Sequence, residues 1–372
     1  QYAKKVKPSI MPILKIGIYV ISELSYPAPA AVNECVETTK QIGKSAVSGF
    51  VNAVLKNFAR DHEAGKDFLP QEGMEKYRIC YGYPDWATKK ILNAYGQAEG
   101  EKILAYRSDN RLQNVRVLTN RLAPCEFQKI LEKNQAEFQP TPLKNAFLLT
   151  DAAMAVVPKD SFVCQSLSSM LTVEALDPQN GETILDACSA PGGKAVYAAE
   201  KAPQSEITAC DIHPHRLDLI RNYAAKTDVK NIKVVLNDAS KENPKFLQAF
   251  SMVLCDVPCS GFGVADKKPE IKIFRTEQDV QALTEIQKKI LEQSSRYVKK
   301  GGFLVYSTCS IFREENADVV RTFLAEHEEF EPAEWCLPDG FEQKTSSFEK
   351  QLLPHRDKTD GFYIAKLRRK EV

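Results

Sequence analysis

From Asp177 to the end of the chain, short apolar runs alternate with amphipathic stretches of helical length. This alternation constrains the fold most strongly, because strands joined by helix-length crossovers pair in parallel and are covered by helices on both faces. The candidate strands are Thr183–Cys188, Glu206–Asp211, Lys233–Leu236, Met252–Asp256 and Phe303–Tyr306, and the candidate long helix is Thr276–Val298. Ligands of parallel sheets bind where the strands end, so the residues that close each run are candidate site residues.

The chain before this region divides into a helical part and a small mixed part. Residues 10–60 carry apolar side chains at helical spacing, and residues 61–75 are rich in Gly, Asp, Pro and Glu, as is typical of a linker. Residues 76–150 combine helical patterns with one candidate strand, Asn114–Leu118. We therefore expect three domains: an all-α domain over residues 1–65, a small α+β domain over 66–150 and an α/β domain over 151–372.

The charge of the chain is balanced overall but not along its length. The 372 residues include 50 lysines and arginines and 49 acidic residues, whereas residues 1–60 carry eight basic residues and three acidic ones. A basic end fits contact with a polyanion, but a solvated helical surface explains it as well, and charge alone favours the second interpretation. The hydrophobic content of 43% excludes wholesale disorder.

No apolar stretch is long enough to span a membrane, and no signal-peptide pattern is present. We therefore expect a cytoplasmic protein without a membrane partner, whose ten cysteines are free thiols. The cysteines are too scattered for a zinc site, since no Cys-x-x-Cys occurs, and no metal is predicted.

The loop after the first candidate strand contains the tight turn Gly192–Gly193 before a helix expected to begin near Ala195. Such a turn lets a ligand approach backbone N–H groups, but the spacing matches neither a Walker loop nor a dinucleotide fingerprint. Asp211 closes the second strand, where a carboxylate can accept both hydroxyls of a ribose, and Asp238 follows the third, within reach of an adenine amino group. Together these residues predict a nucleoside pocket without a pyrophosphate cradle, which favours S-adenosylmethionine over NAD.

Cys259 and Cys309 follow the fourth and fifth candidate strands, and small or polar residues flank both. They are candidate functional residues together with Asp256, which closes the fourth strand. Most single cysteines are buried and inert, and we expect this of the following: Cys35, Cys80, Cys125, Cys164, Cys188, Cys210, Cys255 and Cys336.

Methylation of a pyrimidine at C5 would require residues of these types. C5 is a poor nucleophile, and attack of a thiolate at C6 converts the ring into an enamine whose C5 can take a methyl group. An acid at N3 stabilises the charge that develops on the ring, and a further group assists the elimination that follows. The residue pattern does not tell which of the two cysteines attacks.

These segments resemble the RNA cytosine-C5 methyltransferases of the RsmB and Sun type, in the same order and with similar spacing. The matching segments are Asp186–Lys194, Asp211 with Arg216, Asp238, Asp256–Gly263, Lys268–Lys272, Tyr306–Ser310, Leu353–Arg356 and Asp360–Phe362. The resemblance implies a Rossmann-like S-adenosylmethionine-dependent methyltransferase fold for residues 151–372. Ser189 departs from the alanine that is common in this family.

The resemblance also implies roles for individual residues. Cys309 would be the nucleophile, Cys259 would promote product release, and Asp256 would contact the target cytosine. The implied S-adenosylmethionine site is lined by Cys188, Ser189, Ala190, Pro191, Gly192, Gly193, Lys194, Asp211, Asp238 and Asp256.

The N-terminal part resembles the latter half of a NusB-like RNA-binding domain. The similarity lies in Ala31–Glu37 and Gly49–Leu55, and typical members have further helices before the position of Gln1, so the resemblance implies a truncated domain. Residues 66–150 resemble the small α+β domain that precedes the catalytic domain in this family.

The resemblance as a whole implies methylation of C5 of one cytosine in 16S ribosomal RNA, through a covalent bond between cysteine and C6. The substrate would be naked RNA or an early small-subunit particle, and we expect a monomer. One alternative is the same chemistry on transfer RNA, and only the NusB-like segment argues against it. Another is a non-catalytic RNA-binding ribosome assembly factor, which the retention of Cys259 and Cys309 disfavours. An amino-group methyltransferase would need an Asp/Asn-Pro-Pro-aromatic loop where Asp256-Val-Pro-Cys259 stands.

Overall fold

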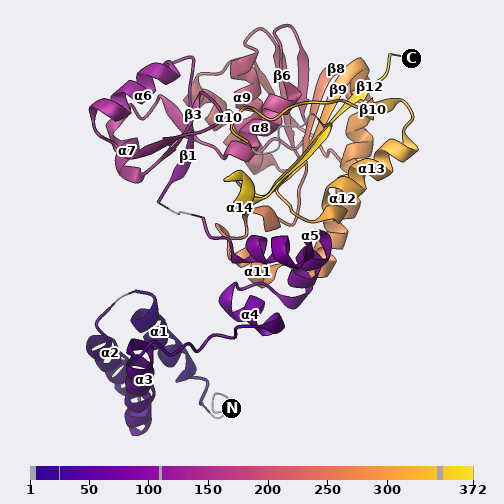
Figure 1. The fold of residues 1–372 in the computed structure, drawn as a ribbon. Coiled ribbons are helices and arrows are strands. Elements are labelled where there is room, and N and C mark those ends of the chain that lie inside the picture. Colours follow the sequence, from indigo (N-terminus) through magenta and orange to yellow (C-terminus); the bar gives the residue numbers. More distant parts are fainter. Residues whose placement is uncertain (1–5, 25, 109–110, 342–346, 372) are drawn as a thin grey trace. The chain divides into compact units, whose positions relative to one another are not determined.

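The computed structural model describes residues 6–24, 26–108, 111–341 and 347–371. They form two compact units, Gln1–Glu72 and Gly73–Val372, each of which is described by itself (Figure 1). Within these described ranges, no helix is both long and apolar enough to cross a membrane.

The first unit is helical, as predicted. Its elements are α1 (Met11–Ser22), α2 (Ala28–Gln41), the short 3-10 helix η2 (Ser45–Val47) and α3 (Ser48–Glu63). Pro27 and Pro29 start α2, because the first turn of a helix does not use the N–H groups that proline lacks. Leu14, Val32, Val51 and other apolar side chains of the three α-helices form one buried core, and residues 64–72 contain neither helix nor strand.

The second unit begins with a helical pair and a small antiparallel sheet. The helices are α4 (Gly73–Cys80) and α5 (Asp85–Ala105), and α5 is kinked at Gly96. The sheet has the strand order β2–β3–β1–β4 and is packed by α6 and α7. Its elements are β1 (Gln113–Val117), α6 (Pro124–Lys133), β2 (Phe138–Pro140), β3 (Ala146–Leu149), α7 (Asp151–Val156) and β4 (Phe162–Cys164). Because β4 lies beyond residue 150, the sheet crosses the expected domain boundary, and the division into three domains stays a prediction.

A larger, mostly parallel sheet carries the rest of the unit. Its order is β10–β12–β9–β8–β5–β6–β7, with β11 paired to β12. The first half contains α8 (Leu167–Leu176), β5 (Thr183–Asp186), α9 (Gly193–Lys201), β6 (Glu206–Asp211), α10 (Pro214–Thr227), β7 (Ile232–Leu236), η3 (Pro244–Phe246) and β8 (Phe250–Asp256). The second half contains η4 (Phe262–Val264), α11 (Glu270–Phe274), α12 (Glu277–Ser295), β9 (Val298–Thr308), η5 (Arg313–Glu315), α13 (Ala317–Glu326), β10 (Phe330–Pro332), β11 (Glu349–Leu352), α14 (Pro354–Asp357) and β12 (Phe362–Arg369).

Helices cover both faces of this sheet, which confirms the predicted Rossmann-like architecture. Alternate strand residues such as Ile184 and Leu254 pack toward α8, α9 and α10, whereas Leu185 and Val253 pack toward α12 and α13 (Figure 1). This period of two follows from the pleat of a strand, and burial on both faces explains why the runs read as continuously apolar.

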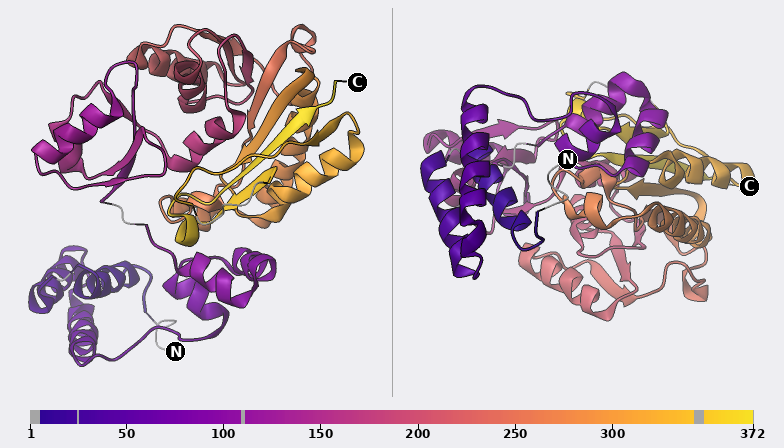
Figure 2. Two further views of the ribbon diagram at one scale, coloured as in Figure 1. Left: turned by 45° about the horizontal axis from the view of Figure 1, so that its top comes forward. Right: turned by 90° about the horizontal axis from the view of Figure 1, so that it is seen from below.

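Several predicted boundaries differ from those observed. The first strand stops at Asp186 rather than Cys188, because the chain turns there into the glycine-containing loop, and α9 begins at Gly193 rather than near Ala195. The long helix ends at Ser295, and the fifth strand is the longer Val298–Thr308. The sequence did not predict the antiparallel strand β12, which pairs with β9 at the side of the parallel strands (Figure 2).

The close helix packing of the first unit gives a stability prediction. A Cβ atom at Gly17 of α1 would lie 2.7 Å from Cδ1 of the buried Leu55 and 3.0 Å from Sγ of Cys35. We expect Gly17→Ala to destabilise this unit by about 1–3 kcal/mol through overpacking. Hydrogen exchange of the α1–α3 amides, followed by mass spectrometry, should show faster exchange in the variant.

Gly49→Ala in α3 is the matched control, because a Cβ atom there meets nothing within 4 Å. Removing a helical glycine should slow exchange slightly. Equal exchange rates in both variants would contradict the tight packing at Gly17.

Candidate active site

The candidate site lies where the strand order of the large sheet reverses. β5 pairs in parallel with β6 on one side and with β8 on the other, so the chain switches direction across the sheet between β5 and β8. Asp186 ends β5 and Asp256 ends β8. Such a switch point leaves a crevice beyond the strand ends, which is the usual ligand site of open α/β sheets.

Asp186 is a buried carboxylate with incomplete hydrogen bonding. Among the described residues, no group meets hydrogen-bond geometry with either of its carboxylate oxygens; the Ser189 hydroxyl and the Cys188 backbone lie close enough to lower its pKa, but less than burial raises it. Burial raises the pKa of Asp186 to about 7, against the opposing effect of the Lys194 charge. A buried polar group of this kind is costly unless a ligand supplies the missing contacts.

The loop after Asp186 is built around Gly192. This residue has a φ of +107° and precedes the first turn of α9, and a Cβ atom there would lie 3.2 Å from Cα of Ile220. Both the positive φ and the close approach to α10 require glycine. The turn keeps the N-terminus of α9 next to the end of β5.

Asp211 and Asp238 lie at the same edge of the sheet. Asp211 is buried, and its Oδ1 accepts the His213 N–H at 3.0 Å. Oδ1 of Asp238 accepts the N–H and the hydroxyl of Ser240, and these hydrogen bonds lower the pKa of Asp238.

These groups fit a nucleoside cofactor with an ammonium group. The buried Asp186 carboxylate fits a cationic amino group. Asp211 and Asp238 add carboxylates beside the neighbouring strand ends, where Arg216 lies 3.8 Å from Asp211 and Lys241 lies 3.1 Å from Asp238. The fit thus rests on carboxylates at three adjacent strands.

Asp256 makes an ion pair that the sequence did not predict. Nζ of Lys194 donates to its Oδ2 at 2.6 Å, and the Ser307 hydroxyl donates to its Oδ1 at 2.7 Å. Burial alone would lower the pKa of Lys194, but the Asp256 carboxylate outweighs it and the pKa is raised. Lys194 therefore stays cationic between Asp256 and the cysteines that follow.

Cys259 and Cys309 face each other, with their sulfur atoms 3.0 Å apart. The hydrogen bond to Cys309, together with burial, raises the pKa of Cys259 well above its ordinary value. Cys259 therefore stays protonated, and its S–H group can donate a hydrogen bond to the sulfur of Cys309.

Two glycines hold the loops that carry these cysteines. The Gly263 N–H donates to the Cys309 carbonyl at 2.9 Å, and the Gly361 N–H donates to the Gly263 carbonyl at 2.8 Å. A Cβ atom at Gly263 would lie 1.8 Å from the Gly361 carbonyl oxygen. Only glycine permits this backbone contact, which connects three segments that are far apart in sequence.

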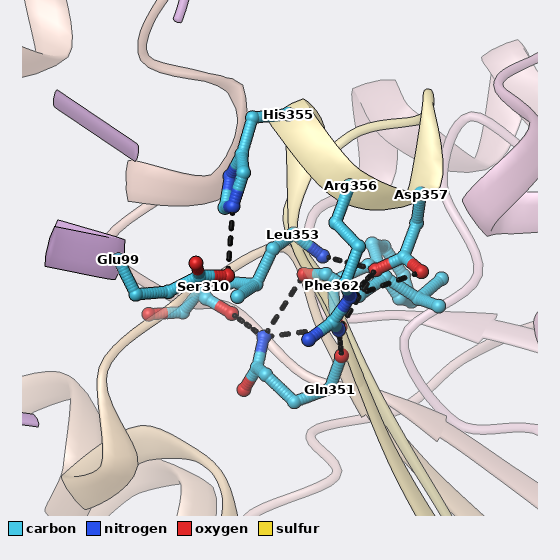
Figure 3. A network of polar contacts seen from close by, with 9 residues as sticks. Glu99, Ser310, Gln351, Leu353, His355, Arg356, Asp357 and Phe362 are labelled. Carbon is cyan, nitrogen blue, oxygen red and sulfur yellow. Dashed lines mark hydrogen bonds and ion pairs between the residues drawn. The ribbon is translucent and has the colours of Figure 1, made fainter. Parts of the chain in front are cut away.

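A polar network from the C-terminal segment reaches the residue after Cys309 (Figure 3). Nε2 of Gln351 donates to the carbonyls of Ser310 at 3.3 Å and Phe362 at 3.1 Å. Arg356 donates to the Gln351 carbonyl at 2.7 Å, and His355 contacts Glu99 of α5 at 2.8 Å. The Leu353–Arg356 motif therefore supports the cysteine loop rather than lining the crevice.

The predicted site residues lie at the ends of the strands of the large sheet, whereas the burial predicted for several cysteines was wrong. Cys35 and Cys210 are buried as expected, whereas Cys125, Cys164 and Cys336 are exposed because they lie in a first helical turn, at the end of a short strand and in a loop. The roles of the predicted site residues stay predictions. Among the described residues, no cluster of His, Cys, Asp or Glu could hold a metal ion.

The fold and the groups at its strand ends are those of a Rossmann-like methyltransferase, and comparisons with known proteins identify its family. Residues 173–368 match the model of the 16S rRNA methyltransferases RsmB/F, and residues 2–60 match that of the NusB family. A probable ribosomal RNA small subunit methyltransferase B from Bacillus subtilis is 34% identical over 377 residues, covering 99% of this chain and 84% of the relative.

Solved structures share the fold. A methyltransferase homolog from Pyrococcus horikoshii has a TM-score of 0.67 at 27% identity, covering 79% of this chain and 97% of the other. NSun6 from the same organism, solved with SFG, has a TM-score of 0.68 at 21% identity, covering 78% and 99%. The chain belongs to the RsmB/F family. It is an RNA methyltransferase, and its cofactor is S-adenosylmethionine, as the sequence predicted.

The raised pKa of Asp186 predicts a pH dependence of stability. The folded protein keeps this proton up to about pH 7, whereas an unfolded chain releases it near pH 3.9. The folded state binds more protons within that window, so the unfolding free energy falls as the pH rises from about 4 to about 7, by at most about 4 kcal/mol. Asp186→Asn should flatten this fall in urea titrations of the cofactor-free protein and should weaken S-adenosylmethionine binding.

Asp218→Asn is the control, because this aspartate is exposed on α10. It should leave both measurements unchanged. An Asp186→Asn variant with the wild-type pH dependence would show that the carboxylate is already ionised in the folded protein.

Proposed function

We propose that the protein methylates C5 of one cytosine in 16S ribosomal RNA through a covalent bond between Cys309 and C6 of the base. The observation that carries the proposal is the pair of thiols at 3.0 Å beside the Lys194–Asp256 ion pair. This chemistry requires a nucleophilic thiol, a polar group at the base and a group that assists elimination, and Cys309, Asp256 and Cys259 supply them. Lys194 adds a positive charge beside Asp256.

Residues around the glycine-containing loop would hold the cofactor. Asp186 and Ser189 offer unpartnered polar atoms for its amino acid end, and Asp211 and Asp238 offer carboxylates for its nucleoside. When bound, S-adenosylmethionine supplies an electrophilic methyl group. Lys194, near the start of α9, is directed to Asp256 and is therefore a residue of the base site as much as of the cofactor site.

Cys309 is the proposed nucleophile because Cys259 keeps its proton. With Cys259 as the donor and the Lys194 ammonium nearby, the sulfur of Cys309 is the one placed to attack, and its proton passes to water as the bond to the base forms. The sulfur forms a bond to C6 of cytosine, and the electron pair of the C5–C6 double bond moves into the ring.

Asp256 is positioned to bind the polar edge of the base. Its carboxylate is held by Lys194 and Ser307, and it can accept a hydrogen bond from the amino group of cytosine. Lys194 then offsets the negative charge that develops on the ring during attack. C5 of the enamine takes the methyl group.

The reaction ends by elimination. Water takes the C5 proton, the electron pair of the broken C–H bond restores the C5–C6 double bond, and the sulfur of Cys309 departs with the electron pair of the C6–S bond. Cys259 is 3.0 Å from the departing sulfur and carries the proton that stabilises it by hydrogen bonding. This assigns nucleophilic attack to Cys309 and assistance in release to Cys259.

The substrate assignment rests on family membership and on the NusB match over residues 2–60, within the basic end of the chain. Methylation by a monomer, in the cytoplasm, of naked RNA or an early small-subunit particle remains part of the proposal.

A methylation assay with mapping tests this function. The protein is incubated with S-adenosylmethionine and unmethylated 16S ribosomal RNA, early small-subunit particles or transfer RNA, and products are read by bisulfite sequencing. We expect one protected cytosine in ribosomal RNA. Protection in transfer RNA alone would overturn the substrate assignment, and no protection by a cofactor-binding protein would overturn the activity.

Exchanging each cysteine for alanine should separate their roles. Cys259→Ala leaves attack possible but impairs elimination, so we expect a covalent protein–RNA species that migrates slowly on a denaturing gel. Cys309→Ala is its matched control and should abolish both the adduct and methylation without a change in cofactor affinity. An adduct in Cys309→Ala, or none in Cys259→Ala, would contradict the assignment.

A further inference from the structure

Each of the two facing cysteines is followed directly by a serine, and both serines reach the same buried carboxylate. Cys259 precedes Ser260 and Cys309 precedes Ser310, and Glu315 of η5 lies between the two loops. The hydroxyl oxygens of the two serines are 3.4 Å apart. No residue of this trio belongs to the groups that react with cytosine.

The Glu315 carboxylate is fully buried and accepts hydrogen bonds from both loops and from α12. Its Oε1 accepts the Ser260 N–H at 2.7 Å and Nε2 of Gln287 at 3.0 Å. Its Oε2 accepts the Ser260 hydroxyl at 2.6 Å and the Ser310 hydroxyl. Gln287 also donates to the Pro258 carbonyl at 2.9 Å, on the other side of Cys259.

The backbone around Glu315 is held as firmly as its side chain. The Tyr306 hydroxyl of β9 donates to the Glu315 carbonyl at 2.6 Å. Asn316 donates to the Ser310 carbonyl at 2.9 Å, and Gln351 reaches that same carbonyl from the C-terminal segment (Figure 3). Ser310 is therefore fixed at its hydroxyl by Glu315 and at its carbonyl by two amides.

We propose that Glu315 is a positioning residue that fixes the relative placement of Cys259 and Cys309 for attack and release. The inference rests on the proposed function, because it concerns the same pair of thiols. A misplacement of about 1 Å between reacting groups lowers the rate of a positioned reaction strongly. One carboxylate that accepts from both loops couples their positions.

Glu315 also acts on Cys259 through its charge. The groups that raise the pKa of Cys259 are Cys309 first, then burial, and then the negative charges of Glu315 and Asp256. These groups come from the loop after β9, from η5 and from the end of β8. Removing the Glu315 charge should therefore let Cys259 lose its proton at a lower pH.

Two substitutions distinguish geometry from charge. Glu315→Asp keeps the charge but withdraws the carboxylate by one methylene, so hydrogen bonds to the loops are lost. Glu315→Gln keeps the length and can retain the bonds to Ser260 N–H and Gln287, while the serine hydroxyls turn to accept from its amide. Glu314→Asp and Glu314→Gln are matched controls, because the neighbouring Glu314 contacts Lys90 and does not reach the cysteine loops.

The activity readout is the turnover number, measured with 16S ribosomal RNA beside S-adenosylmethionine affinity. We expect Glu315→Asp to lower kcat by about tenfold or more, with cofactor affinity unchanged within about twofold. Wild-type kcat in a folded Glu315→Asp variant would overturn the proposal, as would an equal loss of cofactor binding, which indicates general disruption.

The second readout needs no RNA and does not depend on the proposed function. Iodoacetamide labelling of Cys259 and Cys309 is followed across pH by peptide mass spectrometry. We expect the labelling of Cys259 to begin at a lower pH in Glu315→Gln than in Glu314→Gln. Identical labelling profiles would contradict the effect of the Glu315 charge on Cys259. A shifted profile in a protein that methylates no RNA would refute the proposed function but not the contact between Glu315 and the cysteine loops.

Discussion

The parallel pairing of β8 with β9 is the constraint on which the rest of the site depends. Their register places Asp256 opposite Ser307 and Cys255 opposite Tyr306, so the two strands end at the same edge. The loops that follow carry Cys259 and Cys309, and they start next to each other for this reason. A shift of two residues in this register would move Asp256 away from the Ser307 hydroxyl and separate the thiols.

Lys194 forms an ion pair with only one of the two aspartates that end neighbouring strands of the site. It pairs with Asp256 and leaves Asp186, at the end of the adjacent strand, without a hydrogen-bond partner among the described residues. Two aspartates of the same crevice consequently differ: one is held by a cation, and the other has its pKa raised to about 7 by burial. Environments that set such neighbouring acids apart are typical of sites with distinct acid–base roles. Here they separate the proposed base site from the proposed cofactor site.

The sequence predicted those features that depend on local pattern. Apolar runs located β5, β6 and β8, and Asp186, Asp211 and Asp256 end them as expected. It could not predict the strand order, because the reversal between β5 and β8 is a property of pairing between distant segments. It also did not predict the role of Glu315, because a glutamate in a charged stretch is expected to be exposed, whereas the fold buries this one. The contact between Gly263 and Gly361 could not be predicted either, because no sequence pattern indicates that two loops almost a hundred positions apart approach each other closely.

The most direct test of the covalent mechanism is to identify the residue that bonds to cytosine. A 16S ribosomal RNA substrate containing 5-fluorocytidine can be attacked at C6 and methylated, but the fluorine at C5 cannot leave as a proton does, so the bond to sulfur persists. Incubation with S-adenosylmethionine, followed by digestion and peptide mass spectrometry, locates that bond. The mechanism predicts a methylated fluorocytidine attached to Cys309 and to no other residue. Attachment to Cys259, or RNA that is bound together with the cofactor yet carries no covalent link, would contradict it.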